Sequence, residues 1–291
     1  MKLAWIHEHK DQWEIHRLCR VLEVARSGYY AWRARQDTPG SMTLRRGQLL
    51  EQIRVEQELS RGIYGSPRIH AALLDRGIQV CVNTVAKLMK QAGIRASRSR
   101  RFRPMTTESR HAYPPAPNRL DRQFIAHRPN EKWLCDITYV PTEEGMLYLA
   151  SVLDVCSRRI VGWSMSTDLR AQLCLDALAM AIQRRRPGAG LLHHSDRGVQ
   201  YACDAYQVLL VRHGIVCSMS RVGNCYDNAM MESYHGTLKS ELVHLQPGGR
   251  FASIEQARSM LFEYIEVFYN RQRRHSAIGY RSPEAFEASL N

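Results

Sequence analysis

The spacing of apolar residues changes along the chain from a helical period to short, strand-like runs. Before about residue 94, apolar positions recur three and four residues apart, as in Val85, Leu88, Met89 and Ala92. This is the period of one face of an α-helix. After about residue 129, short apolar runs alternate with helical stretches, a pattern typical of an α/β domain. We therefore predict a helical N-terminal region followed by an α/β domain.

The helical region ends in a motif of two short helices. Ser66 is a candidate N-cap for the first, with proline at its first position, and Asn83 is a candidate cap for the second. An earlier helical stretch is expected to break at Ser27-Gly28. The expected helices cover residues 3–35, 43–59, 67–75 and 84–92.

Residues 66–93 therefore have the layout of a helix-turn-helix, in which the second helix enters the major groove of DNA. The polar side chains opposite the apolar stripe of that helix are the candidate DNA contacts: Thr84, Lys87, Lys90 and Gln91. The alternative is ordinary bundle packing or a protein contact, since many small helical bundles share this layout.

Positive charge is concentrated in the N-terminal part. Residues 1–120 hold 22 Lys/Arg against 10 Asp/Glu, a net +12, whereas residues 121–291 hold 19 against 18, a net +1. We interpret residues 95–128 as a basic, proline-rich linker between domains 1–94 and 129–291. A basic region of this kind favours a polyanionic partner. The linker arginines that are candidate phosphate contacts are Arg98, Arg100, Arg101 and Arg103, although a linker that contacts nothing is the alternative.

The cysteine pattern and the N-terminus bear on the compartment. The eight cysteines contain no CxxC pair and no zinc-type Cys/His spacing. The first 20 residues are interrupted by charge and lack the apolar core of a signal peptide, and no stretch is apolar enough for a membrane span. We expect a cytoplasmic protein with reduced thiols and no membrane partner.

The α/β domain is expected to begin with an antiparallel meander of three strands, in WLCDITYV, MLYLASVLDV and RIVGWSMS. Helices and strands then alternate, and Ser253 and Gln256 have the spacing of a capping box at the start of a long final helix. The remaining expected elements are helix 170–186, strand LLHHS, helix 204–213, strand IVCSMS, helix 227–242 and the helix in SIEQARSMLFEYIEVFYN.

Three carboxylates lie where this pattern could bring them together. Asp136 lies in the first strand, Asp196 ends a later strand, and Glu232 lies in a helical run. Magnesium prefers oxygen ligands and is usually held by one or two carboxylates plus substrate phosphate. Two divalent ions about 3.5–4 Å apart can stabilise the attacking and leaving oxygens of phosphoryl transfer. The carboxylates therefore indicate a metal-dependent phosphoryl-transfer site, and an accidental arrangement is the alternative.

The stretches around these residues resemble a known family. WLCDITYV, LDVCSRRIVGW, HSDRGVQY, SRVGNCYDNAMMESYHGTLKSEL and YNRQRRHSAIGYRSP resemble, in order, the retroviral-integrase-like transposases of bacterial insertion sequences. More closely, they resemble the second-reading-frame protein, OrfB, of the insertion sequence three family. YGSPRIHAALLDRGIQVCVNTVAKLMKQAGI is similar to the family's helix-turn-helix.

The resemblance implies a ribonuclease H-like mixed sheet with flanking helices, preceded by the all-helical region. It implies that Asp136, Asp196 and Glu232 are the catalytic and metal-binding residues, with two Mg²⁺ per site and Mn²⁺ as a substitute. The implied activity is DNA transposition: metal-dependent strand cleavage and strand transfer at the ends of an insertion sequence. Two alternatives are a DNA-binding regulator without catalysis and a ribonuclease H-like nuclease that cuts without joining.

The resemblance also implies partners. These are terminal inverted repeats, target DNA, further copies of this chain on DNA, and the first-reading-frame protein, OrfA, either separate or fused to this chain. It implies association with the bacterial nucleoid. The chain lacks the His/His/Cys/Cys zinc element that begins retroviral integrases, so end recognition is expected to rest on the helical region.

Other polar residues in these stretches are expected to contact DNA or to stabilise the fold. Lys239 lies on the Glu232 side of its helix and is expected to contact DNA phosphate, with an exposed lysine that only water surrounds as the alternative. His235 is a packing or a catalytic residue. Asp154 is expected to stabilise a strand end and Asp227 to be an N-cap. His193 and His194 are expected to pack or to form hydrogen bonds, because magnesium prefers oxygen. Unranked candidates for phosphate contact are Arg158, Arg159, Arg221, Arg271, Arg273 and Arg274.

Overall fold

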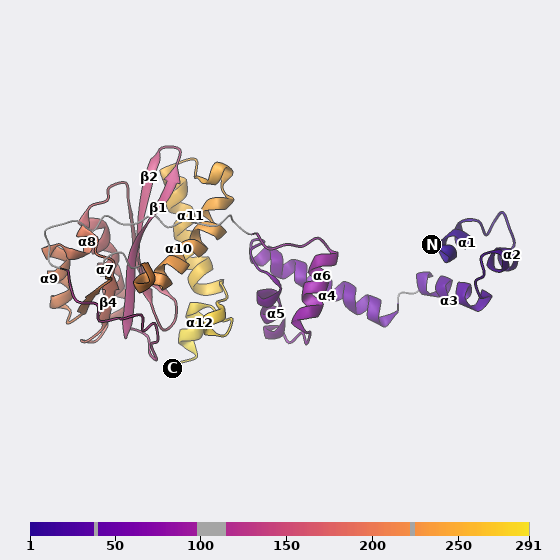
Figure 1. Cartoon of the computed structure of the whole chain (residues 1–291), viewed down its shortest axis with the longest axis horizontal. Helices are drawn as coiled ribbons and strands as arrows, with labels where there is room; N and C mark the ends of the chain where they lie inside the picture. Colours follow the sequence, from indigo (N-terminus) through magenta and orange to yellow (C-terminus); the bar gives the residue numbers. More distant parts are fainter. Residues whose placement is uncertain (38–39, 98–114, 222–224, 291) are drawn as a thin grey trace. The chain divides into compact units, whose positions relative to one another are not determined.

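The chain forms two compact units, Met1–Ala96 and Ser97–Asn291. The structure, a computed structural model, describes residues 1–37, 40–97, 115–221 and 225–290. Each unit has its own buried core. The first unit is built from helices, and the second contains a β-sheet flanked by helices (Figure 1). No helix within the described ranges has the length and apolar character needed to span a membrane.

The first helices of the N-terminal unit are α1 (Lys2–Glu8), α2 (Ile15–Val21) and α3 (Arg26–Asp37). The expected break at Ser27-Gly28 is wrong, because α3 runs through these residues. The chain instead leaves α2 at Glu23, which has φ of 55°, and the Val24 N–H donates to the Cys19 carbonyl at 2.9 Å. A left-handed residue with such a bond ends a helix.

The expected helix-turn-helix consists of α5 (Ser66–Asp75) and α6 (Val82–Gln91), preceded by α4 (Ser41–Leu59). Both predicted caps are wrong. Gly65 is the N-cap of α5 and Cys81 that of α6, so α6 begins one residue before Asn83. The Cys81 carbonyl accepts the first backbone bonds of the helix, from Thr84 and Val85. The apolar stripe is buried as expected, with Val85 at 0%, Leu88 at 8% and Met89 at 5% exposure.

The second unit is built on a mixed sheet of five strands in the order β3-β2-β1-β4-β5. The first three strands form the expected antiparallel meander, while β4 and β5 run parallel to β1. The strands are β1 (Lys132–Thr142), β2 (Gly145–Asp154), β3 (Ile160–Ser166), β4 (Leu192–Ser195) and β5 (Val216–Met219).

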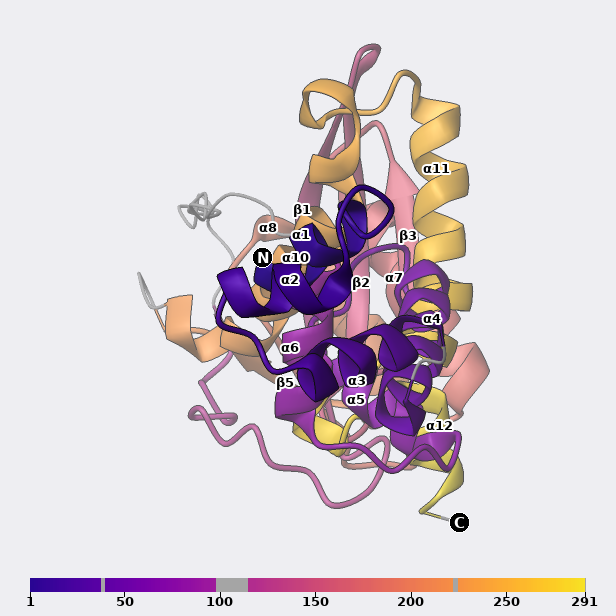
Figure 2. The ribbon, with the colours of Figure 1, turned by 90° about the vertical axis from the view of Figure 1, so that its right-hand side faces the viewer.

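Helices cover both faces of this sheet, with α7 to α9 on one side and α10 to α12 on the other (Figure 1). Seen after a turn of 90°, α11 runs along the strands (Figure 2). Gly162 in β3 allows α7 to approach closely, since an added Cβ would lie 2.3 Å from the Ala177 carbonyl oxygen. The helices are α7 (Ala171–Arg185), α8 (Val199–Ala202), α9 (Asp204–Arg212), α10 (Ala229–Glu241), α11 (Ile254–Glu263) and α12 (Pro283–Ala288).

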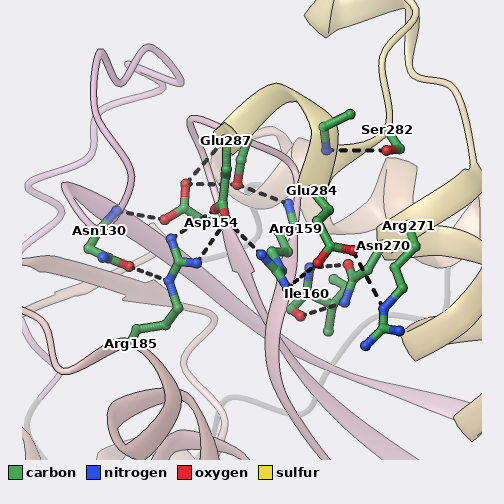
Figure 3. Close-up of polar contacts among 12 residues, drawn as sticks. Asn130, Asp154, Arg159, Ile160, Arg185, Asn270, Arg271, Ser282, Glu284 and Glu287 are labelled. Carbon is green, nitrogen blue, oxygen red and sulfur yellow. Dashed lines mark hydrogen bonds and ion pairs between the residues drawn. The ribbon is translucent and has the colours of Figure 1, made fainter. Parts of the chain in front are cut away.

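The final segment is bound by polar contacts to the loop before β3 and to the end of α7. A π-helix, η4 (Tyr264–Gln272), continues α11, whose Ser253 hydroxyl accepts from the Gln256 N–H as the capping pattern predicted. Glu287 of α12 accepts from Arg159 and from both terminal nitrogens of Arg185 at 2.8 Å (Figure 3). The predicted fold class, a mixed sheet with flanking helices after a helical region, is confirmed.

Candidate active site

Asp136 lies in β1, and Asp196 directly follows the neighbouring parallel strand β4. Leu134 of β1 is paired with His194 of β4, and each aspartate follows two residues later. Side chains two residues apart share a face, and paired strands are about 4.8 Å apart. Asp136 therefore projects from the face of the sheet opposite the one on which Cys135 and His193 contact each other, and Asp196 lies just beyond the end of β4.

Glu232 comes to this face from α10, where it lies in the first turn. The Asn228 side chain at the N-cap donates to the Cys135 carbonyl at 3.2 Å, which ties the helix start to β1. One turn along, His235 Nδ1 lies 3.5 Å from Asp136 Oδ2. Partial burial raises the pKa of Glu232, the charge of Asp136 raises it further, and His235 acts in the opposite direction. Glu232 and Asp136 are thus close enough to repel each other.

Backbone donors orient the two aspartates. The Gly198 N–H donates to Asp196 Oδ1 at 2.9 Å, and the Ile137 N–H donates to Asp136 Oδ1 at 3.0 Å. Tyr139 lies near both, because its pKa is raised by burial, then by Tyr148 and by the charges of the two aspartates. The two aspartates thus place negative charge near Tyr139, and all three side chains are half-buried.

The donor types fit a hard divalent cation. Carboxylate oxygens are the ligands that Mg²⁺ and Mn²⁺ prefer, and a cation would relieve the repulsion between Asp136 and Glu232. The side chains are not drawn together around one point: within the described ranges, no three His, Cys, Asp or Glu residues are close enough to enclose an ion.

Lys239 lies near this cluster and is half-buried. Burial lowers its pKa, while the charge of Asp136 acts to raise it. The lysine is therefore near Asp136, and its contact with DNA phosphate stays a prediction. On α6, Lys87, Lys90 and Gln91 are exposed and Thr84 is half-buried, with its hydroxyl 3.0 Å from Cys81 Sγ. DNA contact by these four residues likewise stays a prediction.

The two histidines before Asp196 are packing residues, as predicted. His193 Nε2 lies 2.9 Å from both Cys135 Sγ and the Tyr206 hydroxyl. Burial, and then the charge of His194, lowers the pKa of His193 to about 3. Burial lowers the pKa of His194 to about 4, and the charge of Asp227 opposes part of this decrease. Both imidazoles are neutral at pH 7.

Asp154 and Asp227 are structural, as predicted. Asp154 accepts backbone bonds at the end of β2 from Asn130, Cys156 and Ser157. The expected cap role of Asp227 is wrong, because Asn228 is the N-cap of α10 and Asp227 instead accepts from Arg221 and other side chains.

Several predicted phosphate contacts are bound within the protein. Arg273 is 3% exposed and donates to both carboxylate oxygens of Glu241 at 2.6 Å, so it is not available to DNA. Arg158 is half-buried, and burial lowers its pKa. The linker arginines Arg98, Arg100, Arg101 and Arg103 lie outside the described residues. Arg159, Arg221, Arg271 and Arg274 contact, in that order, Glu287, Asp227, Glu284 and the Tyr280 carbonyl.

Sequence reasoning missed one part of this region. Residues 115–128, assigned to the linker, include a stretch that packs against β5: Leu120 is 1% exposed and its N–H donates to Ser218 Oγ at 3.2 Å. Asn118 donates to Asp227 Oδ2 at 2.9 Å. The only sequence signal was an isolated leucine in a polar stretch, which is too weak to predict docking.

Comparison with known proteins gives concordant matches. Residues 126–225 and 213–283 match two family models described as an integrase core domain, and residues 45–102 match an HTH-like domain. The chain is 43% identical over 287 residues to the transposase InsF for insertion sequence IS3A of Escherichia coli (strain K12), covering 99% of this chain and 98% of that protein. It is 45% identical over 270 residues to the insertion element IS600 uncharacterized 31 kDa protein of Shigella sonnei, covering 92% and 97%.

Solved structures give weaker matches. The simian T-cell lymphotropic virus intasome in complex with PP2A regulatory subunit B56 gamma matches with a TM-score of 0.47 and 13% identity, over 81% of this chain and 74% of that one. The HTLV-2 integrase catalytic core domain in complex with magnesium matches with a TM-score of 0.43 and 15% identity, over 56% and 99%.

Proposed function

Because this chain belongs to the family of IS3 transposases, we propose that Asp136, Asp196 and Glu232 are the residues with which it cleaves and joins DNA strands. The chain is a DNA transposase, a polynucleotidyl transferase of the DDE type. The observation that supports the residue assignment is geometric. Asp136 lies in β1 and Asp196 directly follows the parallel strand β4, and the charges of both raise the pKa of Tyr139. Glu232 of α10 is close enough to Asp136 for its own pKa to be raised.

We propose Mg²⁺ as the cofactor, two ions per site, with Mn²⁺ as a substitute. When bound, such ions supply charge neutralisation at the attacking and leaving oxygens and help to generate the nucleophile. Asp136, Asp196 and Glu232 would be the residues that hold these ions. The backbone N–H groups of Ile137 and Gly198 keep the two aspartates oriented before substrate arrives, as a preorganised site requires.

DNA binding is proposed to involve both units. In the region 1–94, the exposed polar side of α6 would read the terminal inverted repeats through Lys87, Lys90 and Gln91, with Thr84 at the helix start. The linker arginines Arg98, Arg100, Arg101 and Arg103 would contact the phosphate backbone, and in the core 129–291 Lys239 would contact phosphate near the carboxylates. Copies of the chain would assemble on the paired ends, and the first-frame protein, alone or fused, would complete the complex.

The test is a strand-transfer assay with the full chain. Labelled duplex carrying the terminal repeat of the neighbouring element is incubated with MgCl₂, MnCl₂ or EDTA, and products are separated on a denaturing gel. We expect metal-dependent nicking at the repeat boundary followed by joined products. Asp136→Asn, Asp196→Asn and Glu232→Gln should each abolish both while binding DNA in EDTA.

The matched control is Asp168→Asn, which removes an exposed carboxylate of the same unit and should retain wild-type products. Near-wild-type cleavage by any of the three triad variants would refute the assignment of that residue. Binding without chemistry by the wild-type chain, also in the presence of the first-frame protein, would indicate a regulator of transposition instead.

A further inference from the structure

A stretch before the sheet packs against β5. The N–H groups of Arg119 and Leu120 both donate to Ser218 Oγ of β5, at 2.9 and 3.2 Å. Ser218 is fully buried, and its hydroxyl lies 2.8 Å from His194 Nδ1. Because Oγ already accepts two bonds, its own proton is directed to Nδ1, which leaves the proton of the neutral imidazole on Nε2.

The hydrogen bonds continue in one direction from there. His194 Nε2 lies 3.1 Å from Ser220 Oγ, and Ser220 Oγ donates to the Ser195 carbonyl at 3.3 Å. Ser195 directly precedes Asp196. A directional chain of buried hydrogen bonds therefore runs from the backbone of residues 119–120 to the end of β4, where Asp196 begins its turn.

Asp227 ties the same stretch to the other end of the site. Asp227 is 0% exposed and accepts from Asn118 Nδ2 at 2.9 Å and from Arg122 Nε at 3.2 Å. It also accepts from the Arg221 backbone N–H and guanidinium at 2.9 to 3.0 Å. The next residue, Asn228, is the N-cap of α10 and binds the Cys135 carbonyl next to Asp136. The position of Asp227 thus sets where α10, and with it Glu232, begins.

We propose that Asn118, Ser218 and Asp227 are positioning residues of the active site, and that docking of residues 118–122 holds Asp196 and Glu232 in register with Asp136. The inference rests on the proposed function of the three carboxylates. Groups that orient metal-binding side chains typically change metal affinity by tenfold to a hundredfold when they are removed. A merely structural brace would lower stability and leave metal affinity unchanged.

The chain offers a matched structural brace in Asp154. It is also 0% exposed and collects four bonds from Asn130, Cys156 and Ser157, but it faces the network of α12 at the end of β2 (Figure 3). Asp154→Asn therefore removes the charge of a buried, multiply bonded aspartate without touching the network of Asp227.

The experiment uses the full chain and two readouts. MnCl₂ is titrated into the protein while the unfolding midpoint is followed by differential scanning fluorimetry, and the Mn²⁺ concentration for half-maximal cleavage is measured in parallel. We expect Asp227→Asn and Asn118→Ala to raise the half-saturating Mn²⁺ concentration about tenfold or more in both readouts. Asp154→Asn should lower the midpoint without metal but leave half-saturation unchanged. DNA binding in EDTA should be unchanged in all three.

Two results would overturn the inference. One is wild-type half-saturation in Asn118→Ala, which removes a half-buried side chain and remains informative if Asp227→Asn fails to fold. The other is an equal shift in Asp154→Asn, which would indicate loss of rigidity in general. If the wild-type chain itself shows no Mn²⁺-dependent change that Asp136→Asn abolishes, the proposed function fails instead.

Discussion

A buried histidine makes the stability of the catalytic unit sensitive to acid. Burial lowers the pKa of His193 to about 3, whereas an unfolded histidine titrates near 6.5. Between these values the unfolded chain binds a proton that the folded chain does not, so stability is complete above about pH 6.5 and falls as the pH decreases. For this one histidine, the free energy of unfolding changes with pH by at most about 1.4 kcal/mol per pH unit.

We therefore expect the free energy of unfolding, measured in urea at pH 7, 6 and 5, to decrease less steeply in His193→Gln than in the wild type. The control is His213→Gln, which replaces an exposed histidine and should keep the wild-type slope. Identical slopes in all three proteins would mean that His193 takes up its proton in the folded state.

Gly162 is the residue for which the packing leaves least room. Its missing side chain would lie 2.3 Å from the Ala177 carbonyl oxygen and 2.7 Å from Ala181 Cβ, both in α7. Gly162→Ala forces β3 and α7 apart, and we expect a loss of at least about 1–3 kcal/mol of stability. Gly236→Ala is the control: an added Cβ in α10 meets nothing within 4 Å, so a gain of about 0.5–1 kcal/mol is expected. Chemical denaturation measures both, and a neutral Gly162→Ala would contradict the packing.

At the scale of elements, an ion pair joins Glu241, the last residue of α10, to Arg273, which directly follows η4. Arg273 and Glu241 are 3% and 8% exposed, and the Tyr264 hydroxyl also donates to Glu241 at 2.8 Å. Glu241→Met leaves a buried, unpaired guanidinium and should cost about 3–5 kcal/mol, whereas the double variant with Arg273→Met should recover much of this.

The control is the solvent-exposed pair Arg54–Glu51 on α4, whose charged atoms lie 2.8 Å apart. Its coupling energy should be no more than about 0.5 kcal/mol. Double-mutant cycles on unfolding free energies give both couplings. A coupling for Glu241 and Arg273 as small as that of the exposed pair would show that the buried contact does not hold α10 in place.

The exposed face of α6 carries an electrostatic prediction. Lys87 and Lys90 point to solvent, and each phosphate contact that is lost reduces the slope of log affinity against log salt by about 0.9. Lys87→Ala/Lys90→Ala should weaken binding to the terminal repeat and reduce this slope by about two, as measured by fluorescence anisotropy. Arg212→Ala on α9, also exposed, should bind as the wild type does. An unchanged slope in the double variant would show that the exposed face of α6 does not contact the phosphates of the terminal repeat.

Elements with a strong period were predictable, and elements set by distant contacts were not. The meander, α7 and the apolar face of α10 follow from spacing alone, as does the strand position of Asp136. The sequence did not predict that α11 continues as η4, because the side chains keep a helical period while the backbone bonds change. The donors of Asp227 could not be predicted either, since Asn118 lies 109 residues away.

At the scale of the whole molecule, the two units have separate cores. Leu73 is fully buried in the first, and Leu178 is fully buried in the second. Domains with their own cores unfold as separate cooperative units. Leu73→Ala and Leu178→Ala, each costing about 2–5 kcal/mol, should therefore shift different transitions in differential scanning calorimetry. A common shift of a single transition by both variants would show that the units unfold together.

The bond between Glu241 and Arg273 also has a consequence for the order of synthesis. A chain is made and folds from its N-terminal end, so the helical unit with α6 is completed long before the partner of Glu241 exists. Arg273 follows Glu241 by 32 residues, and η4 and α12 come later than every proposed catalytic carboxylate. A growing chain would thus complete the proposed DNA-binding helix α6 before it contains Arg273, the residue that pairs with Glu241 at the end of α10. A chain truncated before Arg273 should therefore bind DNA but lack the contact that fixes α10, the helix that carries Glu232.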